Sequence, residues 1–180
     1  MAETAVEFRP AVPADLNDLI ELELSDAPDR PDAAVRAARV QCDRFDRQDR
    51  EQITLFVGEH KGEIVCELAL RWPGQPDRFG RTDREDLADI EDVRVLPGYR
   101  NAGIGTEMIA HVEWLCMREG IDGIGAAFDP STQTRSMLWF ERMGYIRKAE
   151  SYVIGEGASP DTLGAGDVGP AVRVDMTKEF

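Results

Sequence analysis

The sequence contains few of the residues that build metal sites and disulfide frameworks. Among its 180 residues there are three cysteines and two histidines. Cys42, Cys66 and Cys116 are widely spaced and form no C-x-x-C pair, so each is predicted to be a reduced cysteine within the core. His60 and His111 match no metal-ligand spacing, and His111 is expected on the polar side of its helix. The sequence therefore predicts no structural metal.

Long apolar runs are also absent. No segment approaches the ~18 consecutive apolar residues of a membrane-spanning helix. The first ten residues, MAETAVEFRP, include acids and lack the apolar region of a signal peptide. We therefore expect no membrane association and a cytoplasmic location.

Basic residues are scarce relative to acids. The chain has 35 Asp and Glu against 21 Lys and Arg, which gives a formal net charge of −14. Nucleic-acid binding needs a basic surface, so no nucleic-acid partner is expected. The negative field favours a cationic ligand, and the same charge also serves solubility or adaptation to high salt.

Two common catalytic signatures are missing. The sequence contains neither G-x-x-x-x-G-K-[ST] nor G-x-S-x-G. A P-loop kinase and a hydrolase with a nucleophile elbow therefore lack their defining motifs.

The periodicity of apolar residues predicts one domain over residues 1–180 with the order β-α-α-β-β-β-α-β-α-β-β. Strands are expected at 6–9, 53–59, 63–71, 90–96, 121–128, 145–154 and 172–177. Helices are expected at 13–24, 32–50, 104–119 and 131–143. Gly62 predicts a tight hairpin turn between the second and third strands. The connections at 72–89 and 155–170 are long and rich in Gly, Pro and acids.

The second helix has a pattern that predicts which side is buried. Val35, Ala38, Cys42 and Phe45 recur at helical spacing and are expected to face the core. The Arg- and Asp-rich side of the same helix is expected to be solvated.

The stretch from Ile90 to Gly120 organises the rest of the chain. An apolar strand ends before Pro97, and an amphipathic helix begins after a turn that contains Gly103 and Gly105. The free N–H groups at a helix start suit an anion, the glycines allow close approach of a ligand, and Arg100 adds positive charge. The turn is a candidate phosphate site.

The run VRVLPGYRNAGIG, between a strand and a helix, resembles the R/Q-x-x-G-x-G/A signature of the GNAT superfamily of N-acetyltransferases. The resemblance implies a GNAT fold, an α/β (α+β) architecture with a mixed, strongly twisted sheet of about seven strands and about four helices. It implies acetyl-CoA as cosubstrate, with its pyrophosphate on the turn and its pantetheine arm along the preceding strand. The residues so implied are Val93, Val95, Arg100, Asn101, Ala102, Gly103, Ile104, Gly105, Thr106 and Ser136.

Acetyl transfer to an amine needs a proton acceptor, because an alkyl amine with a pKa of ~10.4 is protonated at neutral pH. Glu91 and Asp92, just before Val93, are the candidates, and Glu91 resembles the base proposed in polyamine-type GNAT members. Strand alternation predicts that Glu91 shares a face with Val93 and Val95, whereas Asp92 lies on the other face.

A family pattern N-x-x-A-x-x-L-Y-x-x-x-G-F resembles QTRSMLWFERMGY, with Gln133 for Asn, Ser136 for Ala, Trp139 for Leu and Phe140 for Tyr. In the family the tyrosine often protonates the departing thiolate, which phenylalanine cannot do. Water or another residue serves instead, or the transferase activity is weak or lost.

The acceptor is expected near two acidic loops. Their acids are Asp26, Asp29 and Asp32 in the first, and Asp77, Asp83, Glu85 and Asp86 in the second. The resemblance and the charge predict an N-acetyltransferase for the primary amine of a small cationic molecule, such as a polyamine or an aminoglycoside. The alternatives are acetylation of a protein or peptide, or a non-catalytic acyl-CoA-binding module; a homodimer is also possible by the resemblance.

Overall fold

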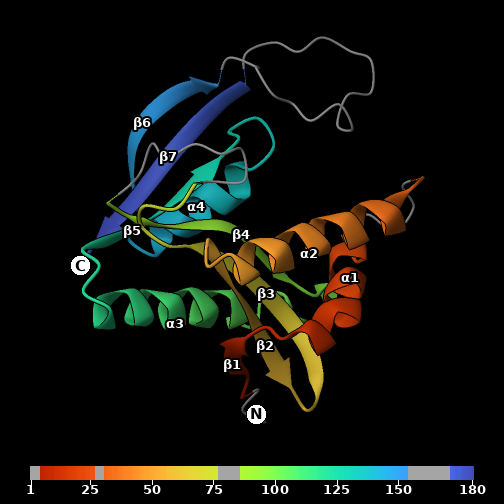
Figure 1. The fold of residues 1–180 in the computed structure, drawn as a ribbon. Coiled ribbons are helices and arrows are strands. Elements are labelled where there is room, and N and C mark those ends of the chain that lie inside the picture. The colour runs from red at the N-terminus through yellow and green to blue at the C-terminus, as the bar shows by residue number, and fades with distance from the viewer. Residues whose placement is uncertain (1–4, 27–30, 77–85, 154–170) are drawn as a thin grey trace.

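A computed structural model describes residues 5–26, 31–76, 86–153 and 171–180 (Figure 1). Its strands are β1 (Glu7–Pro10), β2 (Ile53–His60), β3 (Glu63–Arg71), β4 (Ala88–Val95), β5 (Gly123–Phe128), β6 (Ile146–Val153) and β7 (Ala171–Glu179). Its helices are α1 (Leu16–Leu24), α2 (Ala33–Asp49), α3 (Ile104–Arg118) and α4 (Thr134–Arg142), with 3-10 turns at Pro13–Asp15 and Pro97–Tyr99. The predicted order of elements is confirmed.

The strands form one mixed sheet in the order β1-β2-β3-β4-β5-β7-β6. Only the β4–β5 pair among these neighbours is parallel. Lys61 and Gly62, with φ of 52° and 83°, form the predicted tight turn between β2 and β3. In the described part of the chain, no helix is long and apolar enough to cross a bilayer.

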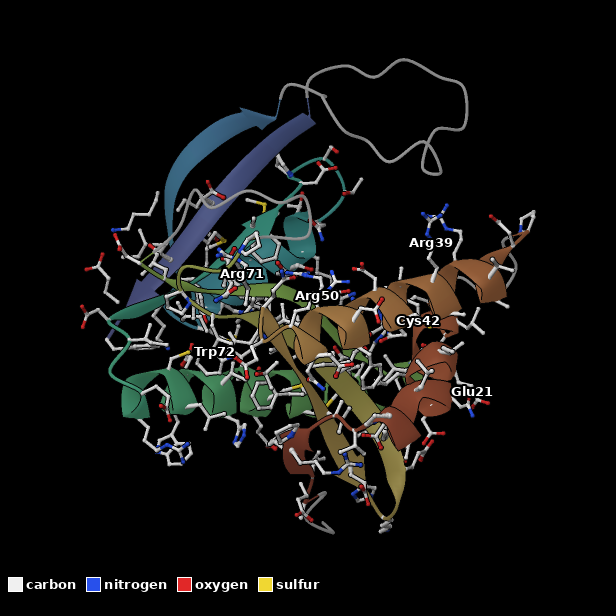
Figure 2. The ribbon with its side chains drawn as sticks, viewed as in Figure 1. Glu21, Arg39, Cys42, Arg50, Arg71 and Trp72 are labelled. Atoms are coloured by element: carbon white, nitrogen blue, oxygen red, sulfur yellow. The ribbon has the colours of Figure 1, made fainter. Side chains whose placement is uncertain are left out.

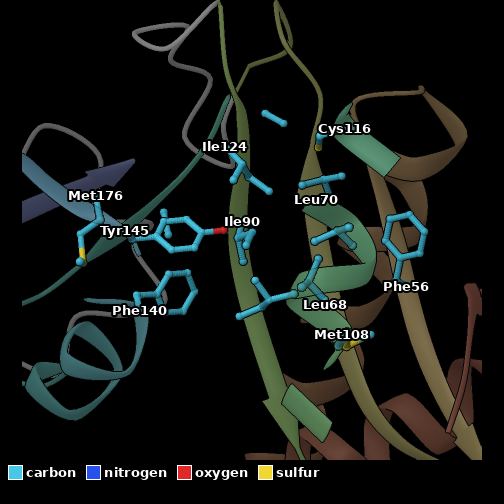
Figure 3. Close-up of a cluster of buried hydrophobic side chains, with 14 of the residues drawn as sticks. Phe56, Leu68, Leu70, Ile90, Met108, Cys116, Ile124, Phe140, Tyr145 and Met176 are labelled. Carbon is cyan, nitrogen blue, oxygen red and sulfur yellow. The ribbon is translucent and has the colours of Figure 1, made fainter. Parts of the chain in front are cut away.

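Two apolar clusters lie on opposite faces of the sheet. On one face α3 and α4 pack on β2 to β5 and β7 through side chains such as Met108, Val112 and Phe140. On the other face Leu19 and Leu22 of α1 pack on β2 and β3. Figure 1 shows α3 apart from α1 and α2, and Figure 3 shows the larger cluster.

Helix α2 buries only part of the side that its apolar pattern predicts: Phe45 is half-buried and packs against the core, whereas Val35 and Cys42 do not. Val35 is 71% exposed and Cys42 is exposed, so the prediction of three core cysteines is wrong for Cys42 (Figure 2). The helix instead buries Gln41, Arg44 and Arg47. Periodicity finds an apolar side, but it contains no information about acidic partners on a neighbouring strand, and these draw the arginines inward.

His111 is half-buried, contrary to its predicted position on a polar side. Its ring centre lies 5.5 Å from that of Phe8 and 6.0 Å from that of Phe56. Burial among these rings lowers the pKa of His111, so its neutral form packs against them at neutral pH.

Gly58 of β2 is packed closely between its neighbouring strands, β1 and β3. A Cβ at this position would overlap the Cys66 sulfur and lie 2.8 Å from Val6 Cγ1. We expect Gly58→Ala to lower the free energy of unfolding by about 1–3 kcal/mol, because a packed core has to shift to admit the methyl group. Gly98→Ala is the control, since a Cβ there meets nothing within 4 Å. Urea unfolding checks this, and equal midpoints for the two variants would contradict it.

The three thiols differ in reactivity. Burial raises the pKa of Cys66 to about 12 and that of Cys116 to about 11, whereas Cys42 is exposed. We expect one thiol per chain to react with Ellman's reagent in the folded protein and three after unfolding, because the thiolate is the reactive form. Replacing Cys42 with Ser should remove the fast reaction, and fast release from a second thiol would show that the interior is open.

Candidate functional site

A cavity of about 460 Å³ opens where β4 ends, α3 begins and α4 passes alongside. Nine of the ten residues assigned to cofactor binding from the sequence line it: Val93, Val95, Arg100, Asn101, Gly103, Ile104, Gly105, Thr106 and Ser136. Ala102 is exposed in the same turn but does not line the cavity. The fold thus brings together three separate sequence segments at one place.

The turn before α3 has the backbone that an anion site needs. Asn101 and Gly103 have φ of 63° and 91°, and Gly103 is the N-cap residue of α3. Glu107 N donates to Gly103 O at 3.0 Å, which closes the first helical turn and leaves the N–H groups of Ile104 to Thr106 without partners inside the helix. These groups and the positive end of α3 face the cavity side of the turn.

Strand β4 supplies an open edge next to this turn. Its register with β5 covers Ala88 to Ile90 only, whereas its register with β3 continues to Val95. Leu96 N donates to Val65 O on the β3 side at 2.9 Å, so by alternation the backbone groups of Val95 and Val93 point to the open side. Such an edge can accept an extended ligand as β5 would.

Gly105 is required for the approach of α4 to α3. A Cβ on Gly105 would lie 3.0 Å from Trp139 Cη2 and 3.4 Å from Val95 Cγ2. Trp139 Nε1 also donates to Thr106 Oγ1 at 3.1 Å. The second glycine of the motif therefore allows helix packing as well as ligand approach.

Three cavity cations were not assigned to the site from the sequence: Arg94 of β4, and Arg135 and Arg142 of α4. Arg135 and Arg142 of α4 line the cavity, are exposed, and make no ion pair within the described residues. They are seven residues apart and lie on the side of α4 that carries Ser136 and Trp139. Helical spacing from Ser136, which was assigned to the site from the sequence, could have identified both arginines.

The other side of β4 carries a network of arginines and carboxylates. A bulge leaves Glu91 unpaired, because Asp92 pairs with Ala69 and Ile90 pairs with Leu70. The bulge breaks the expected alternation, so Glu91 points with Asp92 toward α2 instead of sharing a face with Val93 and Val95.

The two carboxylates are held differently. Glu91 accepts hydrogen bonds from Arg47 at both oxygens, at 2.6 and 3.0 Å, and its side chain is 10% exposed. Asp92 accepts from Arg44 and Arg94 at Oδ2 alone, and its side chain is 31% exposed. Oδ1 of Asp92 makes no hydrogen bond to the described part of the chain. Neither residue lines the cavity.

The same network contains a fully buried carboxylate. Glu67 is 1% exposed and accepts from Gln41 Nε2 at 3.0 Å and Arg44 Nη1 at 2.8 Å. Burial raises the pKa of Glu67, with Arg44 opposing the shift. Burial and the nearby Arg100 lower the pKa of Arg94 to about 10, so Arg94 is still a cation at neutral pH.

Glu23, Glu67 and Asp92 approach one another within the distances of a metal site. The guanidinium groups of Arg44 and Arg94 lie among these oxygens. A metal ion would have to displace two arginines, so this donor set does not suit a resident metal.

Phe140 is a core residue and not part of the cavity lining. It is 1% exposed, and its ring centre lies 4.9 Å from Phe128 and 4.8 Å from Tyr145 (Figure 3). The Tyr145 hydroxyl is buried without a hydrogen-bond partner, and burial raises its pKa. Gln133, in the usual Asn position, accepts from Asp129 N at 2.7 Å and shapes the start of α4.

The acidic loops are described in part. Asp32 and Asp86 are exposed, and Asp26 turns into the cavity. The remaining acids assigned to these loops, Asp29, Asp77, Asp83 and Glu85, lie outside the described residues, as does the connection 155–170.

Solved structures with this architecture are numerous. A Desulfovibrio desulfuricans protein described as a GNAT-family acetyltransferase superposes with a TM-score of 0.70 at 15% identity, covering 97% of this chain and 99% of that one. The ribosomal-protein-S18-alanine N-acetyltransferase of Escherichia coli gives 0.66 at 12% identity, covering 97% and 94%. The PaiA N-acetyltransferase of Thermoplasma acidophilum, in complex with coenzyme A, gives 0.65 at 12% identity, covering 98% and 99%. These likenesses confirm the predicted GNAT fold.

The sequence itself carries the family relationship. No curated protein matches it significantly. The model of the acetyltransferase (GNAT) family matches residues 16–145, a range that runs from α1 through the turn at Gly103 and α4 to Tyr145. The chain therefore belongs to the GNAT family of acetyltransferases.

Proposed function

We propose that this chain transfers the acetyl group of acetyl-CoA directly to the primary amine of a small cationic acceptor. The observation that carries the proposal is the cavity at the open edge of β4, where the turn at Gly103 meets the start of α3. A phosphate-rich ligand with an extended arm fits both features. The PaiA structure, solved with coenzyme A, supports the choice of cofactor.

Each part of the cavity has a proposed role. The N–H groups of Ile104 to Thr106 hold the pyrophosphate, and the cations of Arg135 and Arg142 balance further phosphate charge. The backbone groups of Val93 and Val95 pair with the pantetheine amides along the open edge. In an acidic chain these local cations are needed, because the overall field repels an anion.

The reaction forms a C–N bond and breaks a C–S bond. The carboxylate first takes one proton from the ammonium form of the acceptor, and the neutral amine then attacks the thioester carbonyl. As the C–S bond breaks and the thiolate leaves, the second proton passes from nitrogen to solvent. Glu91 ranks first as this base from the sequence, but the contacts favour Asp92. Its Oδ1 makes no hydrogen bond to the described residues, and its side chain is 31% exposed against 10% for Glu91. The N–H of Val93, on the open edge, is available to the carbonyl oxygen as charge develops.

The described residues supply no tyrosine for the leaving group in the usual place. Phe140 and Tyr145 are both buried in the core. A free thiol has a pKa of ~8.5, so water can protonate the thiolate as it leaves. We propose solvent as the proton donor.

The acceptor proposal rests on charge. The net charge of −14 favours cationic amines over anionic ones. Acetylation of a peptide amine is the second candidate, because one structural neighbour is a ribosomal-protein-alanine N-acetyltransferase.

Acetyl-CoA turnover against polyamines, aminoglycosides, amino acids and short peptides tests the proposal. Free CoA should be detected directly, since Cys42 would react in a thiol assay. Polyamine or aminoglycoside turnover supports the first candidate, and turnover with peptides alone supports the second. CoA binding without turnover on any amine would indicate a binding module, and absence of CoA binding would contradict the cofactor site.

Asp92→Asn and Glu91→Gln test the two carboxylates individually, because each substitution removes one negative charge at one of two neighbouring positions. We expect Asp92→Asn to lower kcat by about 10²–10⁴-fold, with CoA affinity unchanged, because the proton acceptor is lost. Glu91→Gln should cost less than about tenfold, since glutamine keeps a hydrogen-bond acceptor for Arg47. Steady-state kinetics with CoA titrations measures both, and a larger loss in Glu91→Gln would return the role of base to Glu91.

A further inference from the structure

Asp26 is an acid inside a cavity that should bind an anion. It follows Ser25, the C-cap residue of α1, and its side chain is 37% exposed. Its Oδ1 accepts from Arg100 Nη2, and its Oδ2 lies 2.9 Å from Arg94 Nε. A carboxylate at the C-terminal end of a helix is disfavoured by the helix dipole, so the two arginines hold Asp26 in place.

The ion pair with Asp26 neutralises the positive charge of Arg100. Its Nε donates to Val95 O at 2.8 Å, which fixes the guanidinium group against the open edge of β4. Its Nη2 is also engaged, because it donates a hydrogen bond to Asp26 Oδ1. A carboxylate oxygen and a phosphate oxygen accept from a guanidinium group in the same way, so one can replace the other.

We propose that Asp26 is an internal anion of the cofactor site. In the cofactor-free chain it binds Arg100, and the pyrophosphate of CoA replaces it there while Asp26 keeps its contact with Arg94. Asp26 therefore competes with the cofactor and lowers its affinity. The inference rests on the proposed function, because it takes CoA as the ligand of the turn.

The position of Arg94 makes this exchange possible. Arg94 is half-buried, with its side chain 15% exposed, and it also binds Glu23 and Asp92. Asp26 thus has a second cation to remain on when Arg100 turns to the phosphate. Loss of the Arg100 contact alone therefore leaves the Asp26 carboxylate paired with Arg94.

Calorimetric titration of CoA into Asp26→Asn tests the proposal. We expect the affinity for CoA to rise by about 3- to 10-fold, since a surface-type ion pair is broken and a like charge is removed from the phosphate site. Glu21→Gln is the matched control: it removes one negative charge from α1, and Glu21 is exposed (Figure 2) and does not line the cavity. Its affinity for CoA should stay within about twofold of wild type.

Acetyl-pantetheine, which lacks the phosphates, is the second ligand. Asp26→Asn should leave its affinity unchanged, whereas an equal gain for both ligands would overturn the assignment of Asp26 to the phosphate site. A loss or no change in CoA affinity would also overturn it, because a competing anion can only weaken binding. Thermal unfolding of each variant confirms that it is folded before titration.

A double-mutant cycle with Arg100→Gln locates the competition. In the Arg100→Gln background, Asp26→Asn should give a clearly smaller gain, because the shared cation is gone and only the repulsion between Asp26 and the phosphates is relieved. A full gain in that background would place the effect of Asp26 elsewhere and overturn the proposal. If wild-type protein does not bind CoA, the proposed function fails; if it binds CoA and Asp26→Asn gives no gain, only the role of Asp26 fails.

Discussion

A charge inside a protein has to be paired, and this requirement decides how α2 sits on the sheet. Arg44 and Arg47 lie on the buried side of α2, and they bind Glu67 of β3 and the acids Glu91 and Asp92 of β4. Removing one partner from such a pair would leave an isolated charge in a medium of low polarity, at a cost of about 3–5 kcal/mol. The helix is therefore positioned by ion pairs where the apolar pattern would have turned it toward Val35.

Strand β4 is the element that connects this network to the cavity. Toward α2 it presents Glu91, Asp92 and Arg94, and toward α3 it presents Val93 and Val95. The bulge at Glu91 puts two successive acids on the same side, while the loss of pairing with β5 beyond Ile90 opens one edge. One irregular strand thus lines the proposed cofactor cavity and carries the proposed proton acceptor.

The cavity places positive groups where an acidic chain would otherwise repel an anionic ligand. A chain with a net charge of −14 repels a phosphate-rich ligand at long range, so attraction has to come from groups within a few ångströms. The helix start at Ile104 and the cations Arg100, Arg135 and Arg142 supply it locally. The pairing of Asp26 with Arg100 shows that the same acidic composition reaches into the site itself.

Elements with strong local signals can be predicted from the amino-acid sequence alone. The hairpin at Gly62, the strand that ends before Pro97, the turn at Gly103 and the apolar side of α3 all depend on residues that are neighbours in the chain, and each was predicted correctly. Nine of the ten residues assigned to the cofactor line one cavity because they are carried by these local elements and the family motif. The exposure of Cys42, the burial of Arg44, the bulge at Glu91 and the entry of Asp26 into the cavity depend on residues distant in sequence. Glu67, for example, is 23 residues from Arg44, and Arg100 is 74 residues from Asp26. These features follow from the packing of distant segments, because a local pattern of polarity does not specify which distant charge will face a given side chain.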